Sequence, residues 1–188
     1  METPWGPSQN ITVLAEGIIF VDTSSHGGVH LDAKRNAKMP GYMRASNGFY
    51  EEDCGWARPA VVFPEAFPKD QEDARKTLAD WAPELYEKFF NCSLKPGESR
   101  TKDQHEFLKA HANDYIVTTA WGSWHKQVPP GMVGVCAYIG ADRTKHCAYF
   151  LVAEDEYHKR SRDGFVIDPV RHQASHPIES EDYMLNPH

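Results

Sequence analysis

The sequence predicts an α+β fold in which an antiparallel sheet packs against central helices. The C-terminal half has three runs rich in β-branched and aromatic residues, which are typical of strands, at 115–121, 132–139 and 146–152. The middle of the chain has apolar residues at steps of three and four, which is typical of an amphipathic helix. Turn-like segments separate the three runs, so an antiparallel meander is the simplest arrangement for the C-terminal half.

The N-terminal part is expected to begin with an irregular arm over residues 1–10, which contain Pro4, Gly6 and Pro7. Residues 11–23 are β-rich, and Gly17 is a natural bend between two strands. A loop over 24–28 and a short strand over 29–31 follow.

The central elements are predicted as helices. Asp32 can cap a short helix that runs through Lys38, and residues 41–50 are turn-like. Residues 56–63 form a candidate short helix. The clearest helix starts near Asp70, and Pro83 kinks or divides it. Its apolar stripe comprises Ala74, Leu78, Trp81, Leu85 and Phe89.

Further elements complete the expected single domain, 1–188. Thr101 and Gln104 form a capping box for a helix that ends near residue 112. A hairpin loop over 140–145, a helical turn over 154–161 and a last strand over 165–167 follow. From His172 the chain is polar, which predicts a surface tail over 172–188.

Composition narrows the class of protein. Lys and Arg total 20 and Asp and Glu total 27, a net charge of −7, so a nucleic-acid partner is not expected. No apolar run is long enough to cross a bilayer, and the N-terminus has no secretory-signal pattern, which predicts no membrane association and a cytoplasmic location. The four cysteines form no CxxC pair, so we expect reduced thiols.

Two short segments, 24–30 and 50–56, concentrate chemically capable side chains. The first joins hydroxyls, a histidine and two glycines, which would let a ligand approach the main chain. The second joins three carboxylates to a thiol. The predicted catalytic residues are His26, Glu52, Asp53 and Cys54, and the predicted ligand-binding residues are Ser25, Gly27, Gly28, Trp121 and Trp124.

Three chemical hypotheses remain open for this cluster. In the first, Cys54 is a nucleophile, His26 takes its proton, and Asp53 or Glu52 orients the imidazole. Adjacent carboxylates oppose this hypothesis because they raise the pKa of a thiol. In the second, His26 and His30 bind zinc or manganese together with the carboxylates, although the intervening glycines argue against a shared helix face. In the third, His26 works in acid–base chemistry with Glu51 or Glu52.

A purely architectural interpretation also stands. The histidine segment would then be a tight turn, the carboxylates 51–53 would cap a helix start, and Cys54 would be a buried small residue. Trp121 and Trp124 flank a glycine between strands and could line a pocket, although a loop tryptophan commonly anchors a core.

The segments Ser25–Gly28 and Glu51–Cys54 resemble those of a family of uncharacterised bacterial and phage- or plasmid-borne domains. Residues 128–133 and 150–153 are similar to it too. The resemblance implies no established activity, and it implies an origin in a mobile element. Two functions follow as hypotheses: a small hydrolase or transferase that acts on an unknown small molecule, or a non-enzymatic protein that binds and modulates a host factor, such as a host-defence inhibitor.

Overall fold

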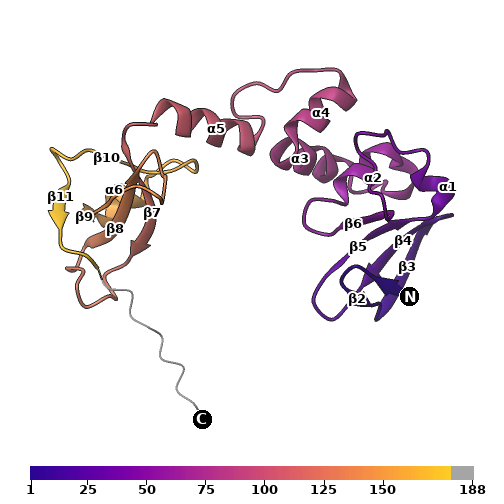
Figure 1. Ribbon diagram of the computed structural model, residues 1–188, viewed down its shortest axis with the longest axis horizontal. Helices are drawn as coiled ribbons and strands as arrows, with labels where there is room; N and C mark the ends of the chain where they lie inside the picture. The colour runs from indigo at the N-terminus through magenta and orange to yellow at the C-terminus, as the bar shows by residue number, and fades with distance from the viewer. Residues whose placement is uncertain (179–188) are drawn as a thin grey trace, which may run out of the picture. The chain divides into compact units, whose positions relative to one another are not determined.

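The computed structural model describes residues 1–178 and confirms an α+β fold whose paired strands are antiparallel (Figure 1). The chain divides into two compact units, Met1–Lys102 and Asp103–His188, which are described here one at a time. The expectation that 1–188 form a single domain stays a prediction. Within the described part of the chain, no helix has the length and apolar character needed to cross a bilayer.

The first unit is built on a four-stranded sheet in the order β3-β4-β5-β6. Its strands are β3 (Asn10–Ala15), β4 (Ile18–Asp22), β5 (Gly27–Leu31) and β6 (Phe49–Glu51). Gly17 makes the predicted bend at φ +75°, a backbone conformation that glycine adopts at no steric cost. Two expectations were wrong. Gly27 and Gly28 belong to a strand and not to a loop, and the turn-like segment 41–50 ends in β6.

The N-terminal arm is not irregular throughout. Strand β1 (Glu2–Thr3) pairs with β2 (Gly6–Pro7) in a small hairpin. The Trp5 ring at its turn packs edge-on against Phe49 of the main sheet, with 5.9 Å between ring centroids. This aromatic contact gives the arm a fixed place on the sheet.

The helices of the first unit pack with the sheet around one hydrophobic core. They are α1 (Ala33–Asn36), α2 (Ala57–Val62), the 3₁₀ turn η1 (Pro64–Ala66), α3 (Gln71–Trp81) and α4 (Pro83–Phe90). As predicted, Asp32 caps α1, and Pro83 separates two helices, although α1 ends before Lys38. Ala74 and Leu78 are buried in the core, whereas Trp81 is 55% exposed and does not belong to the core stripe.

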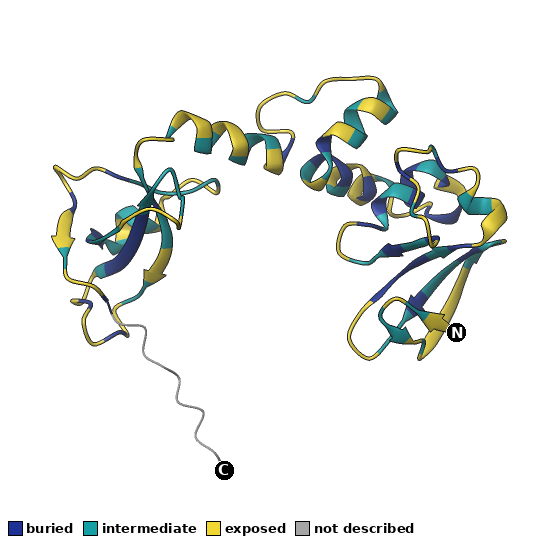
Figure 2. Cartoon of the chain, viewed as in Figure 1, coloured by how far each residue is buried: buried dark blue, intermediate teal, exposed yellow. Residues whose placement is uncertain are grey.

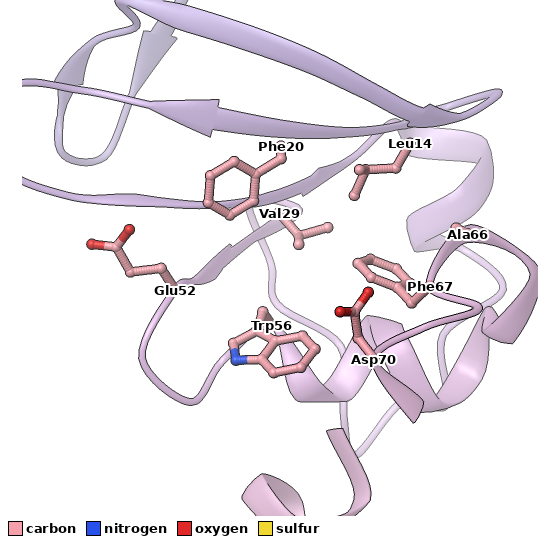
Figure 3. Close-up of a pocket in the computed structure, with 8 residues that line it drawn as sticks. All are labelled: Leu14, Phe20, Val29, Glu52, Trp56, Ala66, Phe67 and Asp70. Carbon is pink, nitrogen blue, oxygen red and sulfur yellow. The ribbon is translucent and has the colours of Figure 1, made fainter. Parts of the chain in front are cut away.

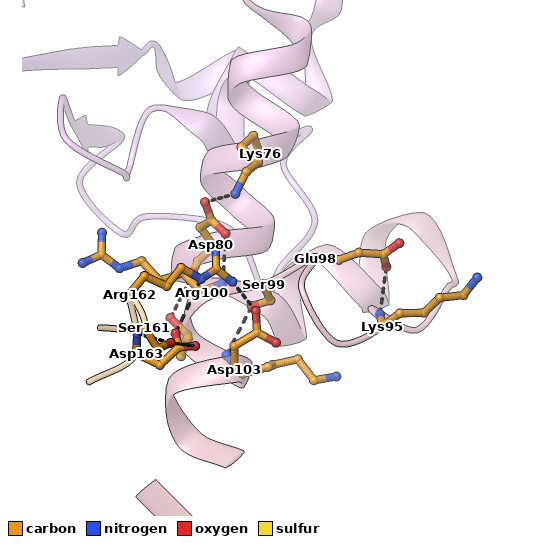
Figure 4. A network of polar contacts seen from close by, with 12 residues as sticks. Lys76, Asp80, Lys95, Glu98, Ser99, Arg100, Asp103, Ser161, Arg162 and Asp163 are labelled. Carbon is orange, nitrogen blue, oxygen red and sulfur yellow. Dashed lines mark hydrogen bonds and ion pairs between the residues drawn. The ribbon is translucent and has the colours of Figure 1, made fainter. Parts of the chain in front are cut away.

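Helix α5 (Arg100–Ala110) starts in the first unit and continues in the second. The predicted capping box does not form: the Thr101 hydroxyl donates to the carbonyl of Asp80, and the Ser99 hydroxyl accepts from the Lys102 amide. Asp80 also pairs with Lys76 and accepts from the Arg100 amide at 2.9 Å (Figure 4). The helix start is therefore held by Asp80 of α3 and by Ser99, and not by the predicted pair of Thr101 and Gln104.

The second unit contains a five-stranded sheet in the order β10-β7-β8-β9-β11. Its strands are β7 (Tyr115–Trp121), β8 (Met132–Ile139), β9 (Cys147–Ala153), β10 (Val166–Ile167) and β11 (Gln173–Ser175), and α6 (Glu154–His158) follows β9. The predicted meander is confirmed in β7-β8-β9. Val133, Val135 and Ala137 share one face and belong to the same hydrophobic cluster, as the alternation predicts. Most of β8 is buried (Figure 2).

The segment from His172 is more ordered than a surface tail. Residues 173–175 pair with β9, and His172 is buried at 5% exposure. The amide of Asp168 donates to Nδ1 of His172, and Nε2 lies 3.2 Å from the Glu156 carboxylate. Residues 179–188 of the predicted tail lie outside the described residues.

Candidate functional site

The sheet brings His26 and Glu52 together. A turn held by Thr23, whose hydroxyl donates to the His26 carbonyl at 2.7 Å, joins β4 to β5. On the other side of β5, the Glu52 amide donates to the Gly27 carbonyl at 3.1 Å. As a result, Nδ1 of His26 lies 3.8 Å from Oε1 of Glu52, with side chains 56% and 35% exposed. The two predicted segments therefore share one place in the fold.

The two glycines serve close packing in this structure. A Cβ on Gly28 would lie 2.3 Å from the Tyr50 carbonyl oxygen and 2.5 Å from the Trp5 ring. A Cβ on Gly27 would lie 2.6 Å from Oε2 of Glu52. Because both lie in β5 between β4 and β6, their main-chain groups face neighbouring strands and not an open, anion-binding loop.

Glu51 organises the turn that contains the predicted acidic cluster. Its carboxylate accepts from the amides of Asp53, at 2.6 Å, and Cys54, at 3.3 Å. Burial raises the pKa of Glu51, but these amide hydrogen bonds outweigh it, and the net effect is a lowered pKa. The architectural interpretation expected the carboxylates of residues 51–53 to cap a helix start. Glu51 does accept from free backbone amides, but it does so in the turn before α2 and not at the first residue of the helix.

Cys54 is exposed, and its environment disfavours the thiolate. Partial desolvation and the Glu51 charge raise the pKa of the thiol, and the opposing effect of Arg58 is smaller. Its Sγ lies 3.9 Å from Oε2 of Glu51. No hydrogen bond joins it to His26 within residues 1–178, so the geometry gives the cysteine nucleophile no base.

The histidine pair is poorly placed for a shared metal. His30 is four residues beyond His26 along an extended chain, which separates their backbones by about 13 Å. The His30 ring packs on Phe49 at 4.3 Å between centroids, and burial lowers its pKa. Within the part of the chain that the structure describes, no three His, Cys, Asp or Glu side chains gather as a metal ion would require.

A pocket of about 320 Å³ opens next to Glu52 (Figure 3). Its lining is mostly apolar and comes from β3, β4, β5 and η1, together with the turns that precede α2 and α3. The lining residues are Leu14, Phe20, Val29, Glu52, Trp56, Ala66, Phe67 and Asp70. Its volume lies at the lower end of the range of small-molecule sites, about 300–1,000 Å³.

Aromatic rings and two carboxylates give the pocket its character. The Trp56 and Phe67 rings lie 6.5 Å apart between centroids, and Phe20 lies across the pocket from Trp56 in Figure 3. The same view places the Asp70 carboxylate beside Trp56 and Phe67. Sequence reasoning identified Glu52 but missed the aromatic residues and Asp70. The one sequence feature that could have indicated these residues is the alternation of apolar side chains and carboxylates over residues 52–70.

The remaining predicted ligand-binding residues belong to different units and are described one at a time. Ser25 is exposed in the turn, where its amide donates to the Thr23 hydroxyl. Trp121 and Trp124 belong to the second unit. Trp121 stacks on Tyr149 at 6.4 Å, and Trp124 is 71% exposed. Their membership of one site with His26 stays a prediction.

The fold and the pocket define an α+β protein with a small, mostly apolar cavity in its first unit. The chain belongs to the family described as "Domain of unknown function (DUF7007)", whose model matches residues 1–112. The match spans the whole first unit and therefore all of the pocket. No curated protein and no solved structure matches the chain.

Proposed function

We propose that the first unit binds a small organic molecule in the pocket next to Glu52. The observation that carries the proposal is an open, apolar cavity whose aromatic walls, Phe20 and Trp56, are only half buried. Half-buried rings around a concave space leave apolar area for a ligand to cover. The ligand would therefore place an apolar group between the sheet and α2.

Titration with 2-phenylethanol, a small neutral aromatic probe, tests this proposal. We expect saturable shifts of the Trp56 indole NMR signal. We also expect at least about a threefold weaker affinity in Phe20→Ala, because the ligand loses one wall. Val13→Ala is the control, since Val13 is 73% exposed on β3 and does not line the pocket. The absence of saturable binding, or equal weakening by both substitutions, would contradict the proposal.

The His26–Glu52 pair favours a second candidate, a hydrolase or transferase that uses carboxylate–histidine acid–base chemistry on the bound molecule. Glu52 lines the pocket, and His26, which does not line it, lies 3.8 Å from the Glu52 carboxylate, so one member of the pair would face a bound ligand directly. Screening the protein against ester and phosphoester probes tests it. Turnover that disappears in both His26→Ala and Glu52→Gln supports the enzyme, and turnover that survives in either variant argues against it.

Exposed Trp124 favours the non-enzymatic alternative, in which a phage or mobile-element protein acts in the cytoplasm on a host factor. A tryptophan that is 71% exposed is typical of an interaction surface. Under this alternative, Trp124→Ala abolishes recovery of one defined host protein from the cytoplasmic fraction, whereas His26→Ala does not. Equal recovery with both variants would remove the alternative.

A further inference from the structure

We infer that the ligand of this pocket is a small organic cation, an ammonium or guanidinium group joined to an apolar body. The inference rests on the proposed function and adds the charge of the ligand to it. Its basis is the coincidence of aromatic rings and carboxylates that lack neutralising partners at one cavity.

The two carboxylates are available to a ligand. Asp70 forms no side-chain hydrogen bond or ion pair within residues 1–178. The one ion pair of the Glu52 side chain within residues 1–178 is with His26, at 3.8 Å. Neither carboxylate pairs with a Lys or Arg among these residues: Arg35 pairs with Glu65, and Arg58 lies over the Tyr50 ring. The pocket thus presents two carboxylates that no Lys or Arg neutralises among the described residues, and the N-terminus of α3 at Asp70 supplies only partial positive charge.

The aromatic walls suit the same chemistry. The face of an indole or phenyl ring carries partial negative charge and attracts a cation placed over it. The attraction is stronger for tryptophan than for phenylalanine. Trp56 and Phe67 stand beside Asp70, and Phe20 lies on the opposite wall (Figure 3). A cation between these rings gains attraction from both the rings and the carboxylates. An anion would be repelled by both.

The remaining walls determine the rest of the ligand. Leu14 offers aliphatic surface, and the buried Val29 and Ala66 lie behind it, so this wall cannot hydrogen-bond a polar chain. A volume of about 320 Å³ is suited to a compact molecule. The geometry therefore favours an arylalkylamine or alkylamine over a polar polyamine or an acidic metabolite.

A matched pair of probes tests the inference. Phenethylamine and 2-phenylethanol have the same aromatic body and differ mainly in the charged ammonium group. We expect phenethylamine to bind about tenfold more tightly at low salt, with the preference declining as salt is added. Glu52→Gln and Asp70→Asn should each reduce that preference about threefold, and the double variant should nearly abolish it. Binding of the neutral alcohol should hardly change.

Asp73→Asn is the matched control, because Asp73 lies on exposed α3 surface near Asp70 in sequence but does not line the pocket. Urea unfolding of each variant establishes that it folds. Equal binding of amine and alcohol overturns the cation inference and leaves the proposed function standing. Binding of neither probe overturns the proposed function itself. An amine preference that the double variant retains assigns the effect to the overall acidity of the protein, and overturns the inference.

Discussion

Nδ1 of His26 lies 3.8 Å from Oε1 of Glu52, across the junction between the β4–β5 turn and the end of β6. Main-chain pairing of Gly27 with Glu52 creates the contact, so the backbone determines the proximity and the side chains add little to it. Both side chains are substantially exposed, and exposed ion pairs contribute about 0–1 kcal/mol.

The first prediction concerns that pair. His26→Ala should change the free energy of unfolding by less than about 0.5 kcal/mol, because the side chain is exposed. It should also leave 2-phenylethanol binding intact, because His26 does not line the pocket. Urea denaturation and NMR titration measure the two effects. A loss above about 2 kcal/mol would show that the imidazole has a structural role.

A second prediction tests the glycine packing. Gly28→Ala should destabilise the first unit by about 2 kcal/mol or more, since its Cβ would meet the Tyr50 carbonyl and the Trp5 ring. Gly41→Ala is the control, because a Cβ there meets no atom within 4 Å. Urea denaturation monitored on first-unit amides distinguishes the two variants. If the two variants lose the same free energy of unfolding, close packing in β5 is not the reason that position 28 requires glycine.

The third prediction is the pH dependence that Glu51 produces. The folded state lowers the pKa of this carboxyl below its usual value of 4.5, so its stabilisation is complete above that pH. It is lost as the pH falls through the lowered folded-state pKa. Glu51→Gln should therefore cost about 1 kcal/mol at pH 7, the usual size of a capping effect, and progressively less in acid. Unfolding measured from pH 7 to pH 3 gives the difference, and a gap that widens in acid would contradict the assignment.

A fourth prediction concerns Cys54. Its raised pKa leaves little thiolate at neutral pH, so alkylation by iodoacetamide should be slower than that of a free cysteine. Glu51→Gln removes a nearby negative charge and should accelerate the reaction about threefold. Both rates are measured in a Cys92→Ser protein, because Cys92 is the other exposed cysteine among the described residues and would also react. Rapid alkylation of unsubstituted Cys54 at pH 7 would revive the nucleophile hypothesis.

The fifth prediction concerns the second unit. His172→Ala should accelerate hydrogen exchange in β9 and cost about 1–3 kcal/mol, because it leaves the Asp168 amide without its acceptor and opens a buried space. His158→Ala, at an exposed position on α6, should have no such effect. Equal exchange in both variants would mean that residues 173–175 hold to β9 without the histidine.

Local pattern determined much of this protein. Runs of β-branched and aromatic residues predicted β7, β8 and β9, and Pro83 separated α3 from α4, because strand propensity and the missing proline amide act within a few residues. The same reasoning failed where distant groups compete. Thr101 caps nothing in its own helix because the Asp80 carbonyl takes its hydroxyl. Gly28 is a strand residue because β4 and β6 pair with it on both sides.

The sequence alone identified Glu52 and its neighbour His26 as candidates and raised the electrostatic objection to Cys54. Only the tertiary structure decided that Glu52 belongs to an aromatic pocket with Asp70, since η1 and the start of α3 fold back towards β3 and β4. Strands, turns and local electrostatic effects depend on residues that are close in sequence, so the sequence alone predicts them. A cavity depends on which distant walls meet, and that is decided by packing of the whole unit.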